Sequence, residues 1–334
     1  MLIRPFDGSR RDAEGLLAVE RGTFAESPYN ADEVIHLLTN GEQRAWLAIL
    51  EGEVAGFVTA FLTCTLHGRN WEVDLVAVQP VSQGQGMATE LIKAAVEGAG
   101  GHSLSRSQIA PAGFAIQRPS GGLQIRHEQK CDLLSLDKAR ALVATDNLAS
   151  QRAFTKAGFI PEETIYDLLL YEIRGFVPRP LDSGPVTVRD LALSAEEAGA
   201  VLRLGEGLTL RPDDVLNLAS RKANEILVAV RRGQIAGFAE LLYVETLLYR
   251  GIWLESVIAQ GADREIQAAL ISEAVERAKR KGLDEIGCLV RTRRRGMAEG
   301  AEKAKNMENH LLREALIGQG CGVVNEYYIY RRGL

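Results

Sequence analysis

Apolar and polar positions change period within the first hundred residues, and that change marks the central unit of the chain. The run Trp71–Val78 mixes β-branched and apolar residues with two carboxylates, Glu72 and Asp74, which predicts a mostly buried strand with one polar patch. Pro80 ends the strand, because proline cannot donate to a sheet ladder. From Met87 onward the apolar positions recur at helical spacing, which predicts a helix.

Similar patterns predict strands and helices on both sides of this unit. Before residue 176, strand patterns cover 2–6, 44–50, 54–62 and 139–145, and helical patterns cover 12–24, 31–38 and 148–157. After residue 185, strand patterns cover 187–189, 226–230 and 235–243, and helical patterns cover 195–204 and 212–223. The arginine-rich stretch 291–296 is predicted to be a solvated loop, with a phosphate- or nucleic-acid-binding patch as the alternative.

The second half repeats the first in the order of its elements and in part of its sequence. Residues 52–57 and 233–238 share glycine, alanine, glycine and phenylalanine in the same order, and Leu91-Ile92 matches Leu270-Ile271 at nearly the same offset. We infer a duplicated domain.

A proline-rich stretch separates the two copies. The run 176–185 holds three prolines and a glycine and cannot lie inside a helix or a central strand, so we predict a linker there. The predicted domains are 1–175 and 186–334. The first carries an insertion near 102–135, in which we expect an extra hairpin.

The turn between the central strand and its helix has the character of an anion site. The first amides of a helix have no intrahelical acceptor, and the helix dipole adds positive charge there. Gly84 and Gly86 carry no Cβ, so a phosphate can approach the backbone closely. The turn is neither a Walker loop nor a dinucleotide fingerprint. An ordinary strand–turn–helix connection remains the alternative.

These residues resemble a known family. The pattern Val76-Ala77-Val78-x-Pro80-x-x-Gln83-Gly84-x-Gly86-x-Ala88-x-x-Leu91 is similar to the acetyl-CoA-binding motif of the GNAT N-acetyltransferase superfamily. The resemblance implies an α/β (mixed α+β) fold of two tandem GNAT-like domains. Each would have a mixed, mostly antiparallel sheet with a splayed parallel strand pair, flanked by helices.

The resemblance also implies a set of acetyl-CoA-binding residues. Pantetheine would bond to the backbone of the central strand, and the pyrophosphate would lie on the glycine turn. The expected residues are Val76, Ala77, Val78, Gln83, Gly84, Gln85, Gly86, Met87, Ala88, Thr89, Asn147, Ser150 and Phe154.

A second family motif is matched only in part. Asn147, Lys156, Gly158 and Phe159 fit it, but Phe154 replaces a tyrosine that commonly reprotonates the CoA thiolate in this family. That role is vacant unless another residue or water fills it.

The central strand offers candidate catalytic carboxylates. Acetyl transfer needs a deprotonated amine, and a buried carboxylate with a near neighbour has a raised pKa suited to taking that proton. We predict Glu72 as the base, assisted by Asp74 on the same face. The alternative is that both carboxylates face solvent or form ion pairs with a neighbouring strand.

The second copy departs from the motif. Aligned without gaps, Gly84 falls on Asp263, Gly86 on Glu265 and Ala88 on Gln267. Carboxylates there would repel a pyrophosphate. We therefore predict that residues 186–334 are a degenerate copy with a structural role.

Composition and charge limit the remaining possibilities. Apolar residues at 46% and charged residues at 25% are typical of a globular protein, and no apolar run is long enough to span a membrane. Four scattered cysteines have no metal-ligand spacing, so reduced thiols in a cytoplasm are expected, with no metal. The net charge of −5 does not favour nucleic acid or membrane partners.

The leading interpretation is an N-acetyltransferase that moves an acetyl group from acetyl-CoA to a primary amine by direct attack on the thioester. The acceptor would be a small-molecule or peptide amine, with a slight preference for cationic amines, and the protein a monomer or homodimer. The alternatives are a non-catalytic acyl-CoA-binding sensor and a scaffold that has lost its carrier role.

Overall fold

The computed structural model describes residues 1–24, 28–40, 42–100, 136–173, 186–205, 207–294 and 307–334. The predicted insertion, the predicted linker and Cys131 lie outside these residues. Of the other cysteines, Cys64, Cys288 and Cys321 are buried free thiols.

The strands of both halves form one continuous sheet of twelve strands. Its spatial order is β1-β2-β3-β4-β5-β12-β6-β11-β10-β9-β8-β7. The strands are β1 (Leu2–Pro5), β2 (Arg44–Leu50), β3 (Glu53–Thr65), β4 (Gly68–Val78), β5 (Leu136–Ala144), β6 (Ile160–Glu172), β7 (Val186–Asp190), β8 (Asn224–Arg231), β9 (Gln234–Glu245), β10 (Arg250–Ala259), β11 (Glu285–Arg294) and β12 (Gly322–Gly333). The pairs β4–β5 and β10–β11 are parallel, and the other neighbours are antiparallel.

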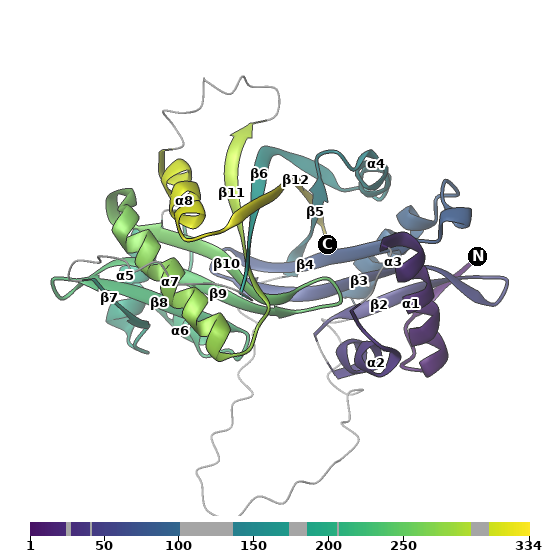
Figure 1. Cartoon of the computed structure of the whole chain (residues 1–334), viewed down its shortest axis with the longest axis horizontal. Coiled ribbons are helices and arrows are strands. Elements are labelled where there is room, and N and C mark those ends of the chain that lie inside the picture. The colour runs from purple at the N-terminus through teal and green to yellow at the C-terminus, as the bar shows by residue number, and fades with distance from the viewer. Residues whose placement is uncertain (25–27, 41, 101–135, 174–185, 206, 295–306) are drawn as a thin grey trace, which may run out of the picture.

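Eight α-helices among the described residues cover the two faces of this sheet (Figure 1). They are α1 (Arg10–Phe24), α2 (Ala31–Asn40), α3 (Met87–Gly100), α4 (Leu148–Lys156), α5 (Ala195–Leu204), α6 (Pro212–Ala219), α7 (Arg264–Arg280) and α8 (Met307–Gly318). In the first half α3 and α4 pack on one face and α1 and α2 on the other. In the second half α7 and α8 take one face and α5 and α6 the other.

The two halves have exchanged their last strands. Strand β12 lies between β5 and β6, and β6 in turn lies between β12 and β11 (Figure 1). Tyr330 is paired with Ala141 of β5, and Glu172 of β6 is paired with Glu285 of β11. Each half therefore completes its sheet with a strand of the other.

The repeat inferred from the sequence appears in the turns as well. The β2–β3 turn has positive φ at Glu51 (54°) and Gly52 (88°), and the β8–β9 turn has it at Arg232 (52°) and Gly233 (78°). Two consecutive residues with positive φ are what a tight two-residue hairpin turn requires, and glycine tolerates them best. The same local chemistry thus forms the same hairpin twice.

Two hairpins fasten the halves to each other. Leu66, in the turn between β3 and β4, is 2% exposed and packs into the core under α5 and α6. Leu247, between β9 and β10, is 3% exposed in the core under α1 and α2. Complete burial of one leucine is worth about 2 kcal/mol, so the reciprocal insertion stabilises the junction substantially. Cys64 O accepts a hydrogen bond from Asn224 Nδ2 at 2.8 Å.

Most predicted elements agree with the structure, and one prediction was wrong. The stretch 291–296 was expected to be a loop, yet 291–294 belongs to β11, where Arg293 bonds to Glu326 of β12 at 2.7 Å. Strand β6 explains the error, because it pairs with β11 through Arg294, and β12 on its other side supplies the carboxylate that binds Arg293. The predicted helix 212–223 ends earlier, at Ala219.

Candidate active site

The parallel strands β4 and β5 separate halfway along their length, as predicted. Their pairing runs from Arg69 and Leu136 to Glu72 and Arg140 and then stops, although β4 continues to Val78. The part of β4 after Glu72 therefore has one edge without a strand partner.

Backbone groups of Val76 and Val78 face that open edge. Gln79 N donates to Ala55 O of β3 at 2.9 Å, and Ala77 is paired with Phe57 of the same strand. Because bonding direction alternates along a strand, the amides and carbonyls of Val76 and Val78 point to the opposite side. The Val78 carbonyl accepts a hydrogen bond from Gln83 Nε2 at 3.1 Å, which fixes the start of the glycine turn.

The glycine turn is exposed and left-handed at two positions. A short 3-10 turn, η1 (Pro80–Ser82), follows β4, and Gly84 and Gly86 then adopt φ of 80° and 82°. A Cβ placed at either glycine would meet no heavy atom within 4 Å. Among the described residues, no hydrogen bond to a protein acceptor occupies the amides of residues 84–89. These groups are the orphan donors of the α3 N-terminus, which suit an anion.

The residues predicted on α4 have local structural roles. Asn147 is the N-cap of α4, and its side chain accepts from Ser150 N at 3.0 Å. Phe154 is 5% exposed and packs edge-on against Phe159, with ring centroids 5.2 Å apart. Tyr330 of the exchanged β12 packs on the same Phe154 ring at 6.0 Å. Phe154 is thus a core residue where the two halves meet.

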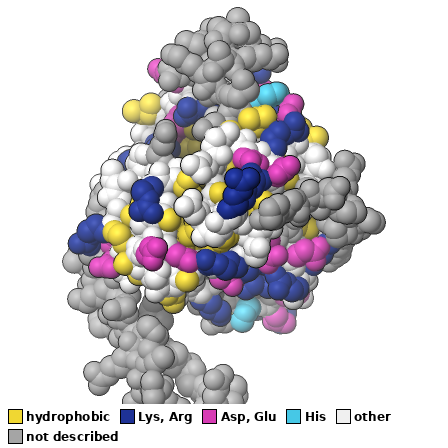
Figure 2. All heavy atoms as spheres, turned by 90° about the vertical axis from the view of Figure 1, so that its left-hand side faces the viewer, with side chains coloured by type: hydrophobic (Ala, Val, Ile, Leu, Met, Phe, Trp, Pro, Cys, Tyr) yellow, Lys and Arg dark blue, Asp and Glu magenta, His cyan; other side chains and the backbone are white. Residues whose placement is uncertain are grey.

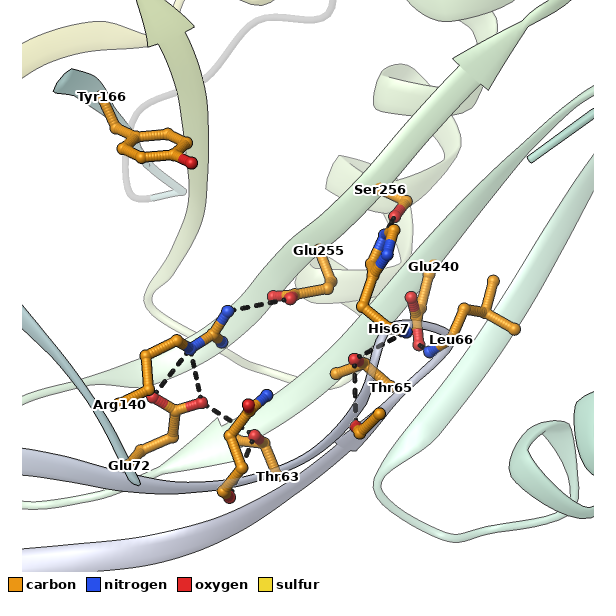
Figure 3. Close-up of polar contacts among 12 residues, drawn as sticks. Thr63, Thr65, Leu66, His67, Glu72, Arg140, Tyr166, Glu240, Glu255 and Ser256 are labelled. Atoms are coloured by element: carbon orange, nitrogen blue, oxygen red, sulfur yellow. Dashed lines mark hydrogen bonds and ion pairs between the residues drawn. The ribbon is translucent and has the colours of Figure 1, made fainter. Parts of the chain in front are cut away.

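Glu72 forms an ion pair with Arg140, and Arg140 continues this network to Glu255 in the second half. Arg140 Nε lies 2.8 Å and 3.0 Å from its two carboxylate oxygens, and the Thr63 hydroxyl donates to Oε1 at 2.9 Å (Figure 3). Arg140 Nη1 also lies 3.2 Å from Glu255 of β10. Burial alone would lower the pKa of Arg140, but the charges of Glu72 and Glu255 raise it. Both Glu72 oxygens are therefore engaged with donors.

Asp74 lies two residues further along and has a different environment. Burial raises its pKa to about 7; hydrogen bonds from Thr246 and Gln43 oppose the shift, and the charge of Glu72 adds to it. Gln43 Nε2 donates to Asp74 at 2.9 Å, and Gln43 Oε1 accepts from Leu247 N at 3.1 Å. The second half therefore helps to hold Asp74 in place. A carboxyl group with this pKa can exchange a proton near neutrality.

The corresponding turn of the second half is shortened and filled. After β10 a 3-10 turn, η3 (Gln260–Ala262), leads through Asp263 alone into α7, whereas four residues separate η1 from α3. The Asp263 carboxylate accepts from the amides of Glu265 and Ile266 at 3.0 and 3.2 Å. Arg231 lies 2.6 Å from Asp263. Burial alone would raise the pKa of Asp263, but Arg231 and these amides outweigh it, and the net pKa lies below its ordinary value. A side-chain anion therefore already occupies this helix end.

The ungapped alignment of the two copies was therefore wrong at this turn. Asp263 follows η3 where Gln83 follows η1, and the second half has no residues between Asp263 and its helix that correspond to Gly84, Gln85 and Gly86. The prediction that this half departs from the motif is unchanged, with a deletion as its physical basis.

A mostly antiparallel sheet in which a parallel pair, here β4–β5, splays beside a glycine turn is the fold of the GNAT acyltransferases. Residues 14–112 match the model of the acetyltransferase (GNAT) family, and this part of the chain belongs to that family. Over its whole length the chain has the fold of tandem GNAT structures. The members of this family are acyltransferases that draw on acyl-CoA.

Solved structures with the same fold cover almost all of the chain. A GCN5-related N-acetyltransferase from Sphaerobacter thermophilus is 17% identical, with a TM-score of 0.58 and coverage of 99% of this chain and 95% of that one. A tandem GNAT protein from the clavulanic acid biosynthesis pathway is 12% identical, with a TM-score of 0.53 and coverage of 99% and 98%. No curated protein matches the chain in sequence.

None of the helices in the described residues has the length and apolarity needed to cross a bilayer. In the same ranges, no cluster of three or more His, Cys, Asp or Glu side chains could hold a metal ion.

Proposed function

We propose that this protein transfers an acetyl group from acetyl-CoA to a primary amine and that the chemistry takes place in the N-terminal half. The observation that carries the proposal is the exposed glycine turn directly beside the open edge of β4, where the amides of residues 84–89 have no acceptor among the described residues. The pyrophosphate would accept from the amides of residues 84–89, and the pantetheine would bond to Val76 and Val78.

Asp74 is better suited than Glu72 to accept the proton of the amine. Both Glu72 oxygens are engaged by Arg140 and Thr63, whereas the pKa of Asp74 is about 7. We therefore assign the base to Asp74, and we assign to Glu72 the role of fixing Arg140 beside the strand. A base whose pKa is close to the working pH combines availability with proton affinity.

The thiolate that leaves needs a proton, which Phe154 cannot supply. On the same face of the sheet, the core around Phe154 also contains Tyr328 and Tyr330 of β12. Tyr330 is 2% exposed, whereas Tyr328 is only partly buried, next to Val143 of β5. We assign the proton donor to Tyr328, which the second half would supply through the exchanged strand.

A phenylalanine at position 328 tests this assignment. We expect Tyr328→Phe to lower kcat by about tenfold to a hundredfold, in the lower range for loss of one general acid, with the Kd for acetyl-CoA unchanged. Tyr327→Phe, on the opposite face of the same strand, is the matched control. Equal rates for the two variants would assign the proton to water instead.

A thiol-release assay tests the function itself. The protein is incubated with acetyl-CoA and a panel of cationic, neutral and anionic primary amines, and free CoA is measured. At least one amine should release CoA, and Asp74→Asn should slow that release by about a hundredfold, in the range for a lost general base. Asp32→Asn, an exposed carboxylate on α2, is the control.

The alternative function is an acyl-CoA sensor without catalysis. The buried Phe154, in place of a tyrosine, favours it. Tight acetyl-CoA binding with no CoA release for any amine would support the sensor and contradict the transferase.

A further inference from the structure

A cavity of about 590 Å³ lies at the junction of the two halves, away from the glycine turn. Its wall combines the β3–β4 hairpin and β5 of the first half with β10 and β11 of the second, and both exchanged strands contribute. Arg140 projects into it from β5, between Ala139 and Ala141, which pack into the core under α3 and α4. Because side chains alternate along a strand, the cavity lies on the opposite face of the sheet.

Cationic side chains dominate this cavity. They are Arg69, Lys138, Arg140, Arg291 and Arg331, and the one carboxylate in the wall is Glu255. Glu72 binds Arg140 and Glu162 binds Arg331 from just outside the wall. Among the described wall residues, Arg140 and Arg331 are thus the cations with a carboxylate at ion-pair distance in the set Glu72, Glu162 and Glu255.

Two of the cations have no carboxylate partner. Within the described part of the chain, no carboxylate comes within 4.0 Å of Lys138 or Arg291, and both residues are exposed and line the cavity. Elsewhere basic and acidic side chains are interspersed, as Figure 2 shows for one end of the molecule. Arg277, for example, binds Asp190 at 2.5 Å and Glu225 at 2.7 Å. The surplus positive charge in the cavity is thus a local feature.

The remaining wall suits a compact organic anion. Tyr166 donates its hydroxyl to Glu162 at 2.9 Å, and Trp253 and Leu254 add an apolar side. A volume of this size is typical of a small-molecule site. Arginine and lysine together recognise carboxylate and phosphate groups.

We propose that this cavity binds a small anion bearing carboxylate or phosphate groups, held by Lys138 and Arg291. The site is connected to the proposed catalytic strand, since Arg140 in its wall bonds to Glu72 two residues before Asp74 (Figure 3). The anion could be part of the acceptor or a separate effector, and both share this chemistry.

Calorimetric titration of the full chain with inorganic phosphate and with citrate tests the proposal. Gly86→Glu serves as the background, because the added carboxylate blocks anions from the glycine turn. Citrate should bind, and Lys138→Ala/Arg291→Ala should weaken its binding by on the order of a hundredfold, about tenfold for each lost charge-assisted contact. Arg203→Ala/Lys222→Ala removes the same charge at exposed sites outside the cavity and should leave the affinity unchanged.

Two further readings separate the sources of the anion. A change in acetyl-CoA affinity with saturating citrate that is seen in the wild type and lost in Lys138→Ala/Arg291→Ala would identify an effector site. If the acetyl-CoA affinity stays unchanged and citrate competes with a carboxylate-bearing amine in the thiol-release assay, the cavity is the binding site of the acceptor. Absence of citrate binding at millimolar concentration would overturn the proposal, as would equal binding by the two double variants when thermal melts show both to be folded.

Discussion

At the scale of single residues, the environment of a carboxylate decides its role more than its position in a motif. Glu72 and Asp74 are two residues apart on one strand, and the sequence favoured Glu72. Arg140, 68 residues downstream, occupies Glu72, whereas Gln43 and Thr246 surround Asp74. No local pattern reveals partners so distant in sequence, so the choice between the two carboxylates required the structure.

The raised pKa of Asp74 has a consequence for stability. In the unfolded chain the group ionises near 3.8, and in the folded chain near 7, so between these values the folded state binds more protons. Stability therefore falls as pH rises through that window. We expect the Tm of Asp74→Asn to equal that of the wild type at pH 4 and to exceed it by about 2–4 °C at pH 8.

Thermal melts at several pH values check this result. Asp32→Asn should show no such pH-dependent difference, because Asp32 is exposed on α2. If the wild type instead gains stability relative to Asp74→Asn as pH rises, the pKa of Asp74 is not raised in the folded protein. The assignment of Asp74 as the base would then lose its physical support.

At the scale of elements, the two helix N-termini show how one architecture can serve two purposes. The glycine turn before α3 could be recognised from the sequence, because glycine spacing and helical periodicity are local signals. The shortened turn before α7 could not, since an ungapped comparison hides a deletion. Asp263 caps α7: its carboxylate accepts from the amides of Glu265 and Ile266 and places a negative charge where a phosphate would bind.

Removal of this cap should affect stability and not ligand binding. We expect Asp263→Ala to lower the free energy of unfolding by about 1 kcal/mol, the usual cost of losing an N-cap. The affinity for acetyl-CoA should stay the same, because the proposed donor site lies in the first half. Denaturant unfolding and calorimetry measure the two quantities. A weaker affinity for acetyl-CoA would place a donor site in the second half.

At the scale of the whole molecule, the exchanged strands make the two halves one folding unit. The duplication was visible in repeated sequence, but nothing in residues 160–172 or 322–333 indicates which half each strand completes. Backbone groups of either segment could bond to more than one antiparallel neighbour, so the pairing becomes visible in the assembled sheet. The division into domains 1–175 and 186–334 thus remains a proposal about sequence and ancestry.

The exchange predicts how fragments behave. We expect 1–175 and 186–334, produced separately, to lack a cooperative thermal transition, because each leaves a strand edge and a hairpin without their partners. Co-expressed, they should assemble into a soluble complex that melts cooperatively. Circular dichroism and size-exclusion chromatography check both outcomes. A 1–175 fragment that folds alone and binds acetyl-CoA would contradict the interdependence of the halves.

The central claim is that the glycine turn of the first half holds the donor's pyrophosphate. Isothermal titration of acetyl-CoA into the wild type, Gly86→Glu and Gly52→Glu tests it most directly. Gly52 is the matched control, with a φ of 88° and open space around it, so both variants bear the same backbone strain and charge. We predict one acetyl-CoA per chain for wild type and Gly52→Glu and no measurable binding for Gly86→Glu. Equal binding by all three proteins, or two acetyl-CoA molecules per chain, would contradict the account.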